Sequence, residues 1–64
     1  MRIRVGDIVQ THYTKRRWVG TVLRVEKRSG ANPLLTIQIT HDKHGHPQRK
    51  CRITTIDESW VTLK

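Results

Sequence analysis

Three consecutive cations lie between two aromatic residues in the chemically richest stretch of the chain, HYTKRRW. Lys15, Arg16 and Arg17 can contact phosphate groups, and the rings of Tyr13 and Trp18 can stack on unpaired bases. Trp18 can equally pack inside the molecule, because a chain of 64 residues needs large side chains to fill its core. We expect the cations to bind phosphate and Tyr13 to stack on a base. For Trp18 the sequence leaves both roles open, stacking on a base and packing in the core.

Two more basic groups follow along the chain. They are Arg24, Lys27 and Arg28, and then Arg49, Lys50 and Arg52. In total, 13 Lys and Arg residues stand against five Asp and Glu residues, which gives a formal net charge of +8. Such a field attracts polyanions, so the pattern predicts a nucleic-acid partner, DNA or RNA, whose phosphates these side chains contact. An acidic protein is the alternative partner that the same charge allows.

A second cluster consists of potential metal ligands. The segment HDKHGHPQRKC contains His41, His44, His46 and Cys51, which are side-chain types that bind zinc. The cations interspersed among them oppose a divalent ion, and Cys51 would have to point back from a strand toward a turn. We therefore expect no metal and no cofactor. A zinc site formed by these four residues is the weaker alternative hypothesis.

The sequence contains no arrangement typical of catalysis. The five acids are scattered, no Ser/His/Asp or Cys/His set has a supporting element, and the four glycines fall in turns or at a bend rather than in a phosphate loop. We expect the protein not to be an enzyme.

Short β-strands must position these side chains. Val, Ile and Thr dominate the ordered stretches, and no helical periodicity extends over eleven residues, which predicts an all-β fold. The expected strands cover residues 2–11 with a turn at Gly6–Asp7, 18–27 with a bend at Gly20, 35–40, 49–54, and the chain after a polar break at 57–59. Residues 27–33 and 41–48 are expected to be loops. On the fourth strand, Cys51 and Ile53 are expected to face inward, and Lys50 and Arg52 outward.

Two segments carry a family resemblance. Val5-Gly6-Asp7-Ile8-Val9, followed by Trp18-Val19-Gly20-Thr21-Val22-Leu23-Arg24-Val25, resembles the opening of SH3-like barrels of the KOW and Tudor type, and Asp57-Glu58-Ser59-Trp60-Val61 is similar to their helical turn and closing strand. The chain is most similar to small SH3-like proteins that phages encode. The resemblance implies one domain, residues 1–64, folded as an SH3-like five-stranded small barrel with a short helical turn before the last strand. It also implies that loops 10–17 and 27–33 lie on the face that relatives use for RNA, DNA or peptide.

These observations together predict a small basic module that binds nucleic acid through loop and strand cations and has no catalytic activity. The alternative is a phage-type interaction module that docks on a host or virion protein. No apolar run exceeds two residues and the one cysteine cannot form an internal disulfide, so we expect a soluble protein of the cytoplasm, the host cytoplasm for a phage protein, without a membrane partner. A thin core and the aromatic side chains Trp18 and Trp60 leave self-association open.

Overall fold

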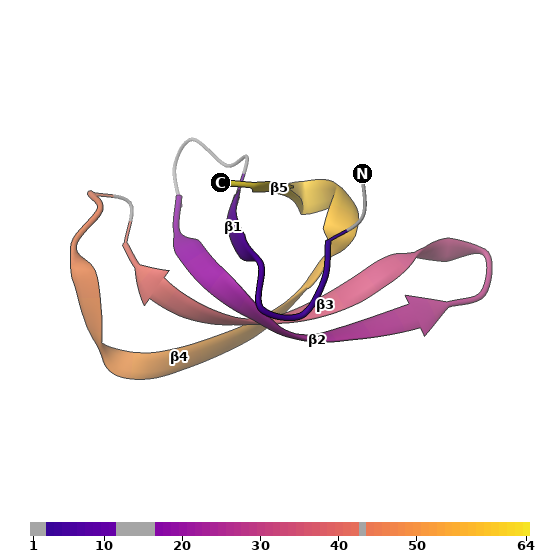
Figure 1. Cartoon of the computed structure of the whole chain (residues 1–64), viewed down its shortest axis with the longest axis horizontal. Coiled ribbons are helices and arrows are strands. Elements are labelled where there is room, and N and C mark those ends of the chain that lie inside the picture. The colour runs from indigo at the N-terminus through magenta and orange to yellow at the C-terminus, as the bar shows by residue number, and fades with distance from the viewer. Residues whose placement is uncertain (1–2, 12–16, 43) are drawn as a thin grey trace.

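One antiparallel sheet of five strands forms the body of the molecule (Figure 1). The computed structural model describes residues 3–11, 17–42 and 44–64, and of Cys51 it describes the backbone alone. The elements are β1 (Ile8–Thr11), β2 (Val19–Arg28), β3 (Ala31–His41), β4 (Pro47–Asp57), the 3-10 helix η1 (Glu58–Trp60) and β5 (Val61–Leu63). The all-β prediction is confirmed. Within the described ranges, no helix has the length and apolar character needed to cross a membrane.

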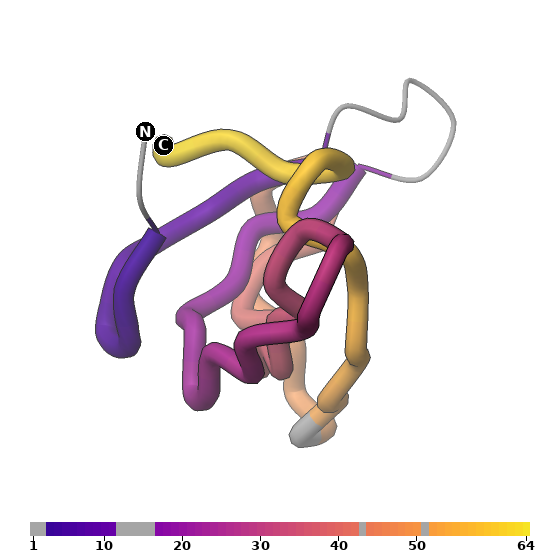
Figure 2. The backbone as a smooth tube through the Cα atoms, turned by 90° about the vertical axis from the view of Figure 1, so that its right-hand side faces the viewer, coloured from indigo at the N-terminus to yellow at the C-terminus, as the bar shows by residue number. Residues whose placement is uncertain are grey.

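The strands are arranged in the order β4-β3-β2-β1-β5. The two strands at the ends of this order, β4 and β5, are joined along the chain by η1, and β5 pairs with β1 (Figure 2). No ladder joins β4 to β5 among the described residues, so the sheet is open. Closure into a small barrel, which the sequence led us to expect, is not shown.

The turn that connects β2 to β3 is shorter than predicted. It consists of Ser29 and Gly30, and Gly30 has a φ of 72°, a left-handed conformation that glycine adopts without a steric penalty. β3 therefore starts at Ala31, and the predicted loop over residues 27–33 is mostly strand. The composition of this segment indicated a loop, but the hairpin needs two residues to reverse direction, and the others belong to β2 and β3, with Arg28 paired to Ala31 and a register shift between Glu26 and Arg28.

The core lies on one face of the sheet. Leu35 and Ile37 of β3 are fully buried, as are Val9 of β1 and Val22 of β2. Residues that oppose each other in an antiparallel pair share a face, and the pairs Val9–Gly20, Gly20–Ile39 and Val22–Ile37 place this row inward. Along β3, the buried residues Leu35, Ile37 and Ile39 alternate with Thr36, Gln38 and Thr40, as in a strand with one buried face. A register shift between Val19 and Gly20 accompanies the bend predicted there.

The predicted orientation of β4 is wrong. The buried residues Leu35, Ile37 and Ile39 pair with Ile56, Thr54 and Arg52, so these even-numbered positions of β4 share the core face. Ile53 pairs with Gln38 on the opposite face, and its side chain is 57% exposed. A shift of one residue exchanges the two faces of a strand, and hydrophobicity alone favoured the wrong one. The side chain of Cys51 lies outside the described structure.

The predicted helical turn before the last strand is confirmed as η1. Asp57 caps it, since its Oδ1 atom accepts a hydrogen bond from the backbone N–H of Ser59 at 2.8 Å. The turn carries the chain from β4 to β5, where Val61 is buried against the core.

Candidate nucleic-acid interface

The predicted basic residues separate between the two ends of β2. Arg17 precedes the first residue of β2, whereas Lys27 and Arg28 are its last two residues. A strand of ten residues spans about 30 Å when straight, so these cations cannot form one compact surface. Figure 1 shows the β2–β3 turn and the β3–β4 turn at opposite ends of the sheet. The family resemblance implied that residues 10–17 and 27–33 lie on one face; their described parts lie at opposite ends of the sheet.

The end of the sheet beside Arg17 collects more of the predicted cations. β3 returns there, with His41 opposite Val19, and β4 begins there at Pro47. Arg49, Lys50 and Arg52 lie on this first part of β4. We call the four exposed residues Arg17, Arg49, Lys50 and Arg52 the basic end.

None of these four side chains takes part in an ion pair with a described acidic residue. Their charges are therefore available to a partner. Three of the five acidic residues, Glu26, Asp57 and Glu58, lie at the far end of β2, and Asp42 lies in the β3–β4 turn beside the basic end. The larger share of the negative charge therefore lies away from the basic end.

Asp42 is the acidic residue of the turn between β3 and β4, and it holds that turn together. Its Oδ1 atom accepts hydrogen bonds from the backbone N–H groups of His44 at 2.9 Å and His46 at 3.0 Å. These bonds, chiefly the one from His46, hold the pKa of Asp42 below its ordinary value of 3.8. The carboxylate therefore has a structural role in the turn that presents β4.

The histidines of this turn do not form a metal centre with other described residues. The rings of His44 and His46 have centroids 6.1 Å apart and planes inclined at 46°. The Nδ1 atom of His41 lies 2.9 Å from the hydroxyl of Thr40, which also donates to the carbonyl of Val19 at 3.2 Å. Over residues 3–11, 17–42 and 44–64, no group of three or more metal-binding side chains is present. The thiol of Cys51 is outside this description, so the zinc hypothesis with that residue is not tested.

The Trp18 side chain packs against the core rather than projecting into solvent. It is half-buried against the hydrophobic core, and its backbone is tied to Thr11 through bonds to the Thr11 hydroxyl at 3.4 Å and from the Thr11 N–H at 3.3 Å. These two bonds hold Trp18 against the end of β1, directly before the first residue of β2. Tyr13, Lys15 and Arg16 lie outside the described residues.

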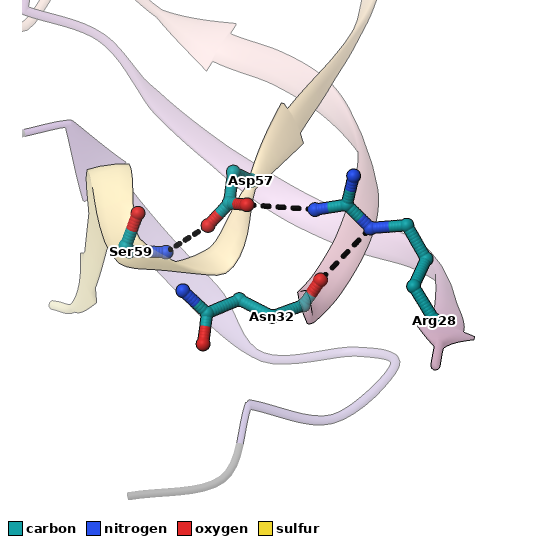
Figure 3. Close-up of polar contacts among 4 residues, drawn as sticks. All are labelled: Arg28, Asn32, Asp57 and Ser59. Atoms are coloured by element: carbon teal, nitrogen blue, oxygen red, sulfur yellow. Dashed lines mark hydrogen bonds and ion pairs between the residues drawn. The ribbon is translucent and has the colours of Figure 1, made fainter. Parts of the chain in front are cut away.

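Arg28 has a structural partner at the opposite end (Figure 3). Its Nη2 atom lies 2.7 Å from Oδ2 of Asp57, and its Nε donates to the carbonyl of Asn32 at 2.9 Å. The pKa of Asp57 is lowered, mainly by the N–H and hydroxyl of Ser59 and also by Arg28. The charge of Arg28 is thus already neutralised, which sequence could not reveal because 29 positions separate the pair.

The remaining predicted residues lie away from the basic end. Arg24 pairs with Thr36 in the middle of β2, on the face opposite the core. Lys27 is exposed and contributes, with Arg4, to the lining of a pocket of about 550 Å³. Arg4 was not among the predicted binding residues, because it belongs to a segment with the composition of an ordinary strand.

We compared the chain with models of protein families, with curated proteins and with solved structures, and no match was found.

Proposed function

We propose that the protein binds nucleic acid through the basic end and catalyses no reaction. The observation that carries this proposal is the gathering of Arg17, Arg49, Lys50 and Arg52 at one end of the sheet, exposed and without described acidic partners. Cations in this state contact phosphates and release condensed counterions, which is the main source of affinity that does not depend on sequence. Phosphate contacts serve DNA and RNA alike.

The proposal also includes three residues that lie outside the described structure. Lys15 and Arg16 precede Arg17 directly, and they would add phosphate contacts, while Tyr13 would stack on an unpaired base. Trp18 leaves the set of stacking residues, because it packs against the core. Arg24, Lys27 and Arg28 leave the set of phosphate contacts.

We further propose that the open sheet is a variant of the SH3-like small barrel. Support comes from the long, bent β2 with its register shifts, from η1 directly before the last strand, and from the pairing of that strand with β1. The segments that resemble KOW and Tudor sequences form these same parts.

Fluorescence anisotropy with labelled oligonucleotides tests the binding proposal. We compare the triple variant Arg49→Gln, Lys50→Gln, Arg52→Gln with the matched control Arg24→Gln, Lys27→Gln, Lys64→Gln, on a 20-nucleotide single strand and a 20-base-pair duplex. Each triple removes three positive charges, so the change in net charge is the same. We expect the basic-end triple to lose at least about tenfold in affinity near 100 mM salt, and the control less than about threefold.

Equal losses in the two triples would show that net charge attracts the nucleic acid without a defined surface. The absence of binding by the unaltered protein near 50 mM salt would remove the proposal altogether. Circular dichroism spectra of both triples verify that the sheet is intact.

A further inference from the structure

A pocket of about 550 Å³ lies at the end of the molecule opposite the basic end. Its apolar lining comes from Ile3 and Val5 before β1, from Val25 of β2 and from Pro33 of β3. Arg4, Lys27 and Arg28 border this apolar surface, and Arg28 is paired with Asp57. An apolar surface with a few charged groups around it is the usual composition of a binding site.

The walls of the pocket are held in place by the fold. Ile3 is 5% exposed and belongs to the core cluster. The segment after it is fixed by a turn in which the N–H of Arg4 donates to Oδ2 of Asp7 at 2.8 Å, and the N–H of Gly6 donates to the carbonyl of Val22 at 2.8 Å. On the other side, the ion pair with Asp57 fixes Arg28. The pocket is therefore largely preformed.

The lining indicates an aliphatic ligand group rather than a nucleobase. All four apolar residues are aliphatic, and no described aromatic ring is part of the lining, so a base would find no stacking partner there. Val5, which is part of this lining, is 63% exposed and so leaves aliphatic surface that a partner can cover.

The charges indicate an acidic ligand of limited charge. Arg4 and Lys27 border the pocket and have no ion pair with a described acid, so both can receive carboxylates. Glu58 also lines the pocket, and Glu26 and Asp57 lie at the same end of the sheet. These acids repel a continuous phosphate backbone more than they repel one or two carboxylates.

We propose that this pocket binds a short acidic segment of a partner protein, with an aliphatic side chain in the pocket and flanking carboxylates on Arg4 and Lys27. The site is separate from the nucleic-acid interface and does not depend on it. The protein would thus have two binding surfaces, one at each end of the sheet.

Chemical-shift mapping of the ¹⁵N-labelled full chain tests this site. The probe is the capped peptide Gly-Asp-Leu-Asp-Gly, and its control is Gly-Asp-Gly-Asp-Gly. We expect the leucine peptide, at up to about 5 mM, to shift the amides of Val5, Val25 and Lys27, with an affinity at least about fivefold above that of the control peptide. Lys27→Gln and Val5→Ser should each weaken binding, whereas Leu23→Ser, which alters an exposed aliphatic residue outside the pocket, should not.

Four results would overturn the inference. They are the absence of shifts, equal shifts with both peptides, shifts that concentrate on Arg49 and Lys50, and stronger displacement of the pocket amides by a thymidine oligonucleotide than by the leucine peptide. The last result would place nucleic acid in the pocket. The anisotropy experiment with the basic-end triple tests nucleic-acid binding separately, because that variant leaves every residue of the pocket unchanged. A failure of the proposed function can therefore be told apart from a failure of the peptide site.

Discussion

Gly20 offers the sharpest test of the packing that positions the basic end. It is buried in β2, opposite Val9 on one side and Ile39 on the other. A Cβ atom at this position would lie 2.5 Å from Cγ2 of Ile37 and 2.6 Å from the carbonyl oxygen of Gln38. The isoleucine methyl can move, but the Gln38 carbonyl belongs to the backbone of β3. Gly20→Ala must therefore displace β2 from β3.

The size of the effect follows from two opposing terms. Overpacking of a core costs about 1–3 kcal/mol, and the upper part of this range applies because backbone obstructs the new methyl group. The alanine also restricts the unfolded chain, which returns about 0.4–1 kcal/mol. We expect a net loss of about 2 kcal/mol, which for a domain of this size lowers the melting temperature by roughly 8–16 °C.

Thermal and guanidinium denaturation, followed by far-UV circular dichroism, measure this loss. Thr21→Ala, at the adjacent half-buried position, is the control and should change stability by less than about 1 kcal/mol. In a double-mutant cycle, Ile37→Ala removes one of the two contacts, so the double variant should be less destabilised than the sum of the single variants. A Gly20→Ala protein as stable as the original would refute the close approach of the two strands.

Three further predictions concern the core, the acid range and salt. Leu35→Ala should lower the free energy of unfolding, measured by chemical denaturation, by about 2–5 kcal/mol, because Leu35 is buried. Ile53→Ala should lower it by less than about 1 kcal/mol, because Ile53 is exposed. Equal losses in the two variants would show that Ile53 faces the core after all. Folding lowers the pKa of Asp57, so at a pH above its unfolded pKa of 3.8 the carboxylate stabilises the folded protein. This stabilisation is lost as the pH falls below 3.8 and through the folded pKa. Asp57→Asn should therefore melt lower at pH 7 and lose less stability on acidification, as pH-dependent melts would show; a parallel loss in both proteins would contradict this. If all four cations of the basic end contact phosphates, the slope of log affinity against log salt concentration on duplex DNA should be about −3.6. The affinity should then fall roughly 150-fold between 50 and 200 mM salt. A salt titration in which the affinity does not change would exclude such contacts.

Local features of the chain predicted the elements well. The β-branched composition indicated strands, including one over residues 35–40, and the polar break at residues 57–59 indicated the turn before β5. Each of these depends on neighbouring residues or on a strand's own period of two, so the sequence contains the necessary information.

Features that depend on distant partners were not predictable in the same way. The face on which Ile53 lies is set by pairing with Gln38, and the neutralised state of Arg28 is set by Asp57 on another strand. The length of the β2–β3 turn was also misjudged, because Asn32 and Pro33 have loop-forming character but lie within β3, where the pairing with β2 has a register shift between Glu26 and Arg28.

The sequence by itself determined that HYTKRRW belongs to a basic, β-rich chain, since charge and strand propensity are properties of residues and their neighbours. Only the tertiary structure decided which cations lie at the same end of the sheet, because the direction and register of β2, β3 and β4 bring the starts of β2 and β4 to one end and Lys27 to the other. Packing against the core cluster likewise left Trp18 half-buried. Strand pairing brings together residues that are distant in the chain, and it separates cations that composition alone would count together.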